Sequence, residues 1–170
     1  MENSMRRFLA ALVLALACTL GHAQSTNPLN YGGRMYLESI EIISTPRYIS
    51  YEDHAILSTQ MRIPSTEITK VEFDFEKNTV SIGGTPNRIK VTSTKKYSTD
   101  YGWVVVIYAD MIDEGDKMEI VWREHGQAYA QQITKDGQQI KIARMNLSRQ
   151  PRIVSEADAA AEMLRGLGTL

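Results

Sequence analysis

The chain has few of the residues that build disulfide frameworks and metal or nucleophile sites. Its 170 residues include one cysteine and three histidines. A single thiol forms no internal disulfide, and zinc sites built from several Cys and His ligands are disfavoured. An excess of one charge is missing too, since 19 Lys and Arg accompany 20 Asp and Glu. This balance excludes the concentrated basic face expected of a nucleic-acid-binding protein.

The sequence also has no apolar run of the roughly 20 residues that a helix needs to span a bilayer. The longest run, residues 8–18, follows two arginines and precedes Gly21-His22-Ala23. A basic segment, a short apolar stretch and small residues before a cleavage position are typical of a secretory signal peptide. We therefore expect residues 1–23 to be removed and the mature protein to be periplasmic or secreted, without a transmembrane span.

Cys18 would leave with this signal peptide, so the mature chain would have neither a disulfide nor a thiol nucleophile. A different interpretation uses Cys18 itself, because bacterial lipoproteins are cleaved before a cysteine that becomes lipidated. The residues before it, Ala15-Leu16-Ala17, do not have the leucine that such sites usually carry at position −3. A lipid anchor at Cys18 remains the alternative, since residues 24–33 would make a suitable tether.

Residues 34–145 have the patterning of a β-protein. Residues 71–76 alternate apolar and acidic side chains, which a strand directs to opposite faces. In the same way, Met118 and Ile120 alternate with Glu119, which is then expected on the water-facing side. Residues 103–109 are apolar at every position and predict a central strand covered on both faces. With roughly seven to nine short strands separated by turns, the expected fold is all-β, an antiparallel immunoglobulin-like β-sandwich.

The segments that flank this predicted sandwich differ from it. Residues 24–33 contain a proline and a Gly-Gly pair and are expected to be a flexible lead-in. Residues 146–170 are expected to be a polar linker followed by a short C-terminal helix. Ser155 and Asp158 have the spacing of a capping box at its start. Met163 and Leu164 give this helix an apolar side that is able to dock on the sandwich or on a partner.

One loop concentrates acidic residues and is the candidate metal site. Oxygen ligands of this kind suit calcium, which takes six to eight of them. The spacing does not match the twelve-residue helix-loop-helix motif, and a surface turn of solvated carboxylates is the alternative. Apart from this Ca²⁺ site, no cofactor is expected. The four candidate ligands are Asp110, Asp113, Glu114 and Asp116.

Aromatic residues near a second turn are the candidate binding surface. Tyr97, Tyr101 and Trp103 flank the turn at residues 100–102. Exposed Tyr and Trp side chains are good platforms for sugars or proteins. In the alternative interpretation, Trp103 lies in the core and Tyr97 covers the end of a strand.

The sequence offers little support for catalysis. His54 and His125 are expected at the surface, and no Gly-x-Ser-x-Gly motif accompanies them. The function expected is therefore a non-catalytic binding or assembly module of the bacterial envelope, with another envelope protein or a glycan as its partner. The alternative is a small secreted hydrolase or sugar-active enzyme. It would need two carboxyl groups that converge at ~5 Å or ~6.5–9.5 Å.

Overall fold

The structure is a computed structural model that describes residues 24–47, 50–51, 59–125 and 128–167. The predicted signal peptide, Cys18 and His54 lie outside these residues. The described chain forms strands β1 (Gln24–Ser25), β2 (Gly33–Thr45), β3 (Met61–Pro64), β4 (Lys70–Asp74), β5 (Thr79–Ile82), β6 (Thr85–Thr99), β7 (Gly102–Met111), β8 (Lys117–Arg123), β9 (Ala128–Asp136) and β10 (Gln139–Ser148), with a 3-10 helix η1 (Pro28–Tyr31) and a helix α2 (Glu156–Leu167).

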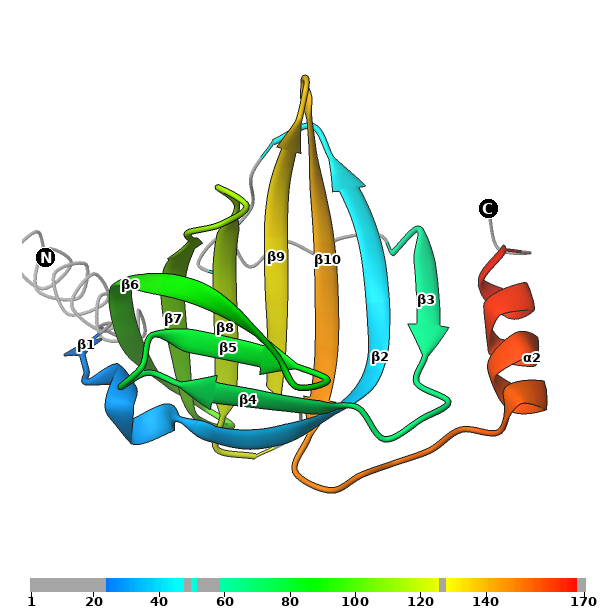
Figure 1. Cartoon of the computed structure of the whole chain (residues 1–170), viewed down its shortest axis with the longest axis horizontal. Coiled ribbons are helices and arrows are strands. Elements are labelled where there is room, and N and C mark those ends of the chain that lie inside the picture. The colour runs from blue at the N-terminus through cyan, green and yellow to red at the C-terminus, as the bar shows by residue number, and fades with distance from the viewer. Residues whose placement is uncertain (1–23, 48–49, 52–58, 126–127, 168–170) are drawn as a thin grey trace, which may run out of the picture.

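Eight of the strands form one closed antiparallel barrel (Figure 1). From β4 to β10 each strand pairs with the next along the chain, while β2 pairs with β4 on one side and β10 on the other. The all-β prediction is confirmed, but the immunoglobulin-like sandwich is wrong, because there is one closed sheet and not two packed ones. Alternation along a strand reports which face is buried and does not report whether the sheet closes.

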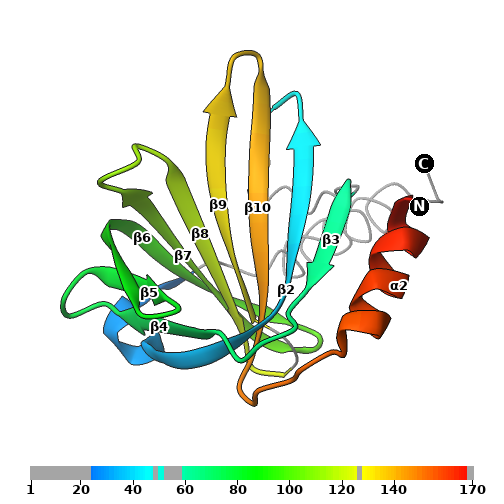
Figure 2. The same ribbon diagram turned by 45° about the vertical axis from the view of Figure 1, so that its right-hand side comes forward.

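Strand β2 is long enough to pair with two different strands along the same edge. Gly33–Tyr36 pair with β4, and Ser39–Ile42 pair with β3. A register shift between Asn146 and Leu147 of β10 accompanies the change along β2. Strand β3 thus lies off the barrel path, with α2 beside it (Figure 2).

The barrel interior is filled by apolar side chains, as expected where eight strands leave little more room than the side chains occupy. Val105 and Ile107 of β7 point inward, and Trp122 of β8 meets Phe73 of β4 edge-on with ring centroids 5.5 Å apart. Val104 and Val106, on the outward face of β7, belong to a separate buried cluster. The prediction that residues 103–109 are covered on both faces is therefore confirmed for the center of this strand.

The two flanking segments contain regular structure. In residues 24–33, expected as a flexible lead-in, β1 pairs with Lys95 and Lys96 of β6, and Asn27 caps η1 by accepting from the Leu29 amide at 3.0 Å. Helix α2 begins as expected, with the Asp158 amide donating to Ser155 Oγ at 3.2 Å. Within the described residues, no helix is long and apolar enough to cross a membrane.

Candidate functional site on the outer face of the barrel

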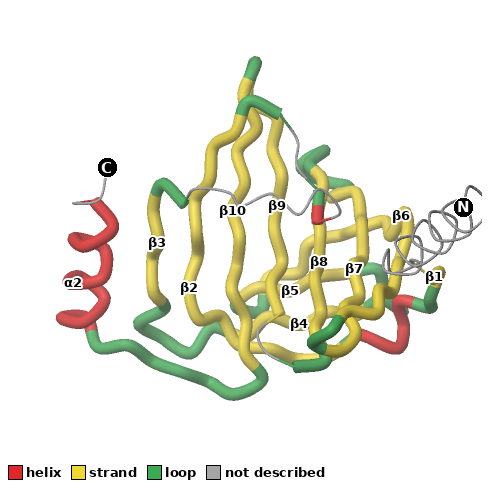
Figure 3. The backbone as a smooth tube through the Cα atoms, turned by 180° about the vertical axis from the view of Figure 1, so that it is seen from behind, coloured by secondary structure: helices red, strands yellow, loops and turns green. Residues whose placement is uncertain are grey.

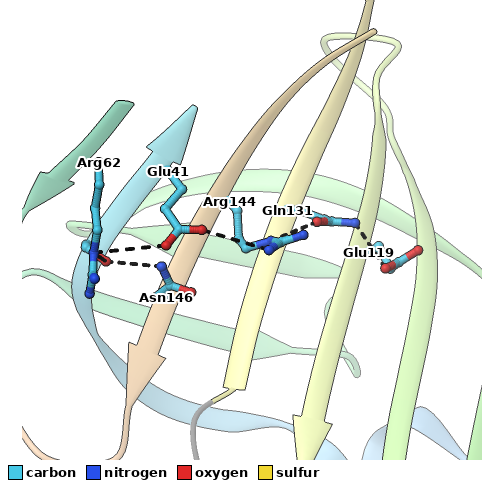
Figure 4. Close-up of polar contacts among 7 residues, drawn as sticks. Glu41, Arg62, Glu119, Gln131, Arg144 and Asn146 are labelled. Atoms are coloured by element: carbon cyan, nitrogen blue, oxygen red, sulfur yellow. Dashed lines mark hydrogen bonds and ion pairs between the residues drawn. The ribbon is translucent and has the colours of Figure 1, made fainter. Parts of the chain in front are cut away.

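A row of polar side chains crosses the outer face of five strands at one level (Figure 4). The row is defined by Arg62 of β3, Glu41 of β2, Arg144 of β10, Gln131 of β9 and Glu119 of β8, and each member is the cross-strand partner of the next. We call it the outer polar row. Because antiparallel partners share a face, one set of registers brings all five side chains together.

The end of the outer polar row on β8 and β9 is buried. Glu119 is 0% exposed and Gln131 is 2% exposed. Gln131 Nε2 donates to Glu119 Oε1 at 3.0 Å, and the backbone N–H of Tyr51 donates to Glu119 Oε2 at 3.3 Å. A carboxyl group removed from water needs such donors, because burial without them costs several kcal/mol.

Positive charge enters the outer polar row through Arg144. Its Nε donates to Gln131 Oε1 at 3.2 Å, and its Nη1 lies 3.8 Å from Glu41 Oε2. The guanidinium carbon also lies 4.7 Å from the ring center of Tyr129. Burial, helped by the negative charge of Glu119, raises the pKa of Tyr129 to about 12. Counted over its whole length, the row has two Glu and two Arg, whose formal charges balance.

The exposed end of the outer polar row reaches the C-terminal helix. Arg62 lies 4.0 Å from Glu41 and 3.3 Å from Glu162 of α2. Its Nε also donates to Ser39 Oγ at 3.3 Å, and Asn146 donates to the same oxygen at 3.1 Å. The row therefore connects the helix, the off-path strand β3 and the seam where β2 meets β10.

A cavity of about 900 Å³ lies beside the outer polar row, over β6 to β10. Three of its lining residues are neighbours of the row in the sheet. Tyr108 pairs with Glu119, Lys117 lies two residues before Glu119 in β8, and Ile133 lies two residues after Gln131 in β9. Ser50 lines it from outside the sheet. We call this space the outer cavity, because Tyr108, Lys117 and Ile133 lie on the outward face of the sheet. Figure 3 shows the strands of this sheet from behind.

Three of the four predicted metal ligands, Asp110, Glu114 and Asp116, line this cavity, but the predicted ligands engage different partners. Asp110 is paired with Lys117 and Asp113 with Arg88. Asp116 accepts from Gln132 and Thr134, at 2.6 Å each. Among the described residues, no three Asp, Glu, His or Cys side chains form a group able to hold a metal ion. Binding of calcium by Asp110, Asp113, Glu114 and Asp116 stays a prediction.

The predicted aromatic surface is divided by the sheet. Tyr97 lies on the outer face, where its ring is 5.8 Å from that of Tyr51. Trp103 packs against the inner core, 6.0 Å from Tyr31. Tyr101, at the tip of the turn, is 89% exposed. The structure thus does not bring the three rings together, and the alternative placement of Trp103 and Tyr97 describes them better.

The apolar residues predicted on α2 face away from the barrel for the most part. Leu164 is 69% exposed, while Ala159, at 2% exposed, is the buried residue among residues 156–165 of the helix. The helix lies along β3 of its own chain. Met163 and Leu164 remain predicted partner-binding residues at the exposed side.

The outer polar row was not found from the sequence. Glu119 was expected to face water because it alternates with Met118 and Ile120, yet its face of the sheet is covered. The sequence does hold one indication that this face is buried: Val104 and Val106 of β7 are apolar and lie on the same face as Glu119. Because Val104 and Val106 need cover on this face, a polar residue such as Glu119 on the neighbouring strand can be buried there as well.

We compared the chain with protein-family models, with curated proteins and with solved structures, and none of them matches it.

Proposed function

We propose that this protein is an exported, non-catalytic binding module of the bacterial envelope and that the outer cavity is its binding site. The cavity carries the proposal: its volume of about 900 Å³ lies within the ~300–1,000 Å³ typical of small-molecule sites. Ile133 and Ile140 give its floor an apolar part and polar side chains lie around them, a combination that holds and orients a ligand. The signal-peptide pattern of residues 1–23 supports export.

The two glutamates of the outer polar row do not have the spacing of a catalytic pair. Glu41 and Glu119 lie on the same face but are separated by three strand intervals, or about 14 Å at ~4.8 Å each. The carboxyl pairs of glycosidases lie at most ~9.5 Å apart. This pair therefore does not support the alternative of a hydrolase with paired carboxylates. Another envelope protein or a glycan was the partner expected from the sequence, and a small ligand suits the cavity better than either.

Fluorescence titration with N-phenyl-1-naphthylamine, an uncharged amphipathic probe, tests the site. We expect saturable binding with one probe per chain. Ile140→Trp fills the cavity and should abolish binding, whereas Ile68→Trp makes the same change at an exposed position outside it. Thr92→Trp at the rim serves as a second blocking variant if Ile140→Trp does not fold. Absence of binding, or binding unchanged in the folded blocking variants, would refute the proposed site.

Export is tested separately by the intact mass of the protein recovered from the periplasm or medium. A mass that begins at Gln24 is expected after cleavage behind Ala23. A protein that keeps residues 1–23 would contradict the proposed export. A lipid-sized increment on Cys18 would replace the released protein with a lipid-anchored one.

A further inference from the structure

We infer that the ligand of the outer cavity is an amphipathic anion, with its acid group at Lys117 and Lys135 and its apolar part on Ile133 and Ile140. This inference rests on the proposed function, because it names the ligand class of the same site. Three properties of the cavity lead to it: the charge of the strand residues that face it, the spacing of two lysines, and the apolar floor next to them.

Of the charged strand residues that line the cavity, most are basic. Lys95, Lys117 and Lys135 line it from β6, β8 and β9, against Asp110 of β7. Asp116 also lines the cavity, but its carboxylate accepts from Gln132 and Thr134, which alternate with Ile133 and therefore lie on the opposite face of β9.

The remaining acidic residue, Glu114, is exposed in the turn between β7 and β8, at the rim of the cavity. The cavity as a whole is balanced, since its described lining has three lysines and three carboxylates. The carboxylates lie at or next to the turn between β7 and β8, whereas Lys135 pairs with Ile140 in the sheet and forms no ion pair with any of the described residues, so this end of the cavity favours an acidic group over a basic one.

Lys117 and Lys135 are placed to act on one acidic group. Lys117 pairs with Ile133, so Lys135, two residues further along β9, is its diagonal neighbour on the same face. Diagonal neighbours lie about 7–8 Å apart, and a flexible four-carbon stem allows each ammonium group to reach a shared anion. Lys117 also pairs with Asp110, but that single carboxylate balances only one of the two lysines.

The floor beside these lysines is suited to an apolar group. Ile133 is a member of a buried outer cluster with Ile43 and Ile142, and Ile140 packs against it. On the opposite side, the ring of Tyr108 lies 5.7 Å from Lys95 Nζ. Thr92 and Ser93, at a register shift in β6, place hydroxyl groups at the rim of the cavity. An acid end and an apolar body therefore meet different parts of the same cavity.

Two probes with the same ring system test the sign of the charge. 8-Anilinonaphthalene-1-sulfonate carries a sulfonate, while N-phenyl-1-naphthylamine has none. We expect the sulfonate probe to bind more tightly at low salt and to lose this advantage as salt rises. Lys135→Gln should weaken it by about two- to fivefold, and Lys117→Gln/Lys135→Gln by more, with little effect on the neutral probe. Lys90→Gln is the matched control, an exposed lysine outside the cavity.

The outcomes separate the ligand class from the site. Equal affinity for the two probes, or sulfonate binding that Lys135→Gln leaves unchanged, would overturn the anionic ligand and leave the binding site intact. Sulfonate binding that persists in a folded Ile140→Trp variant would also overturn it, because the probe would then lie elsewhere. Failure of both probes to bind would instead refute the proposed function.

Discussion

Replacing Arg144 with methionine tests whether the outer polar row contributes to stability. Methionine keeps an apolar stem of similar length but removes the guanidinium. Gln131 would lose the donor to its side-chain oxygen, and Glu41 would lose its partner on β10. The contact with the ring of Tyr129 would disappear as well.

The expected cost follows from burial. Breaking a fully buried ion pair costs ~3–5 kcal/mol, and leaving a buried polar group unsatisfied costs ~1–3 kcal/mol. The side chains of Arg144 and Glu41 are 22% and 18% exposed, and the pair is loose at 3.8 Å, so water moderates the loss. We therefore expect Arg144→Met to lower the free energy of unfolding by about 2–4 kcal/mol.

Urea unfolding followed by tryptophan fluorescence measures this change, with the slope against urea checked for two-state behaviour. Arg34→Met is the matched control, since Arg34 forms a much closer ion pair with Glu72, at 2.6 Å, between side chains 54% and 46% exposed. Solvent screening should make its loss far smaller. If Arg34→Met destabilises the protein as much as Arg144→Met does, burial is not what gives the row its energy.

Three further changes probe other parts of the structure. Asn78 has a φ of 55°, so Asn78→Val should cost about 1–2 kcal/mol in thermal unfolding while Asn78→Gly costs almost nothing; equal losses would contradict this. Ala159→Gln should raise amide hydrogen exchange throughout α2, whereas Ala161→Gln, at an exposed position, should not; unchanged exchange in both would mean that Ala159 does not hold the helix. The pKa of Tyr129 is raised to about 12, so the folded state retains the phenol proton more strongly than the unfolded state. Its contribution to stability is complete below pH ~10 and is lost as pH rises toward 12, and Tyr129→Phe should flatten the pH profile of unfolding in that range.

The local character of the fold could be predicted from the sequence, but its closure could not. Alternation in residues 71–76 and the apolar run at 103–109 identify strands and their buried faces. Whether such strands form two packed sheets or one barrel depends on the pairing of the first long strand with the last. The 9-residue ladder between β2 and β10 makes that choice, and its partners lie about 100 residues apart in sequence.

The candidate site was harder to predict because its residues are ordinary in their local context. Gln131, Arg144 and Glu41 each occur in a strand with polar neighbours, and no spacing along the chain relates them. The acidic loop and the turn aromatics were more conspicuous in sequence. In the structure the acidic loop borders the outer cavity, while Tyr97 and Trp103 pack on opposite faces of the sheet.

The outer polar row also distinguishes the observed closure of the barrel from its nearest alternatives. A two-residue slip of β10 along β2 preserves which side chains face outward, so the apolar pattern alone does not oppose it. A slip in one direction would set Arg144 opposite Ile43 and Glu41 opposite Asn146. A slip in the other direction would set Arg144 opposite Ser39 and Glu41 opposite Ile142. Either slip separates the Arg144–Glu41 pair and leaves partly buried charges without their partners, at a cost of several kcal/mol. The β2–β10 register also sets Ile43 beside Ile142, and both belong to the buried cluster that contains Ile133, the floor of the outer cavity. The charges that favour the closing register therefore also favour the packing beneath the proposed binding site.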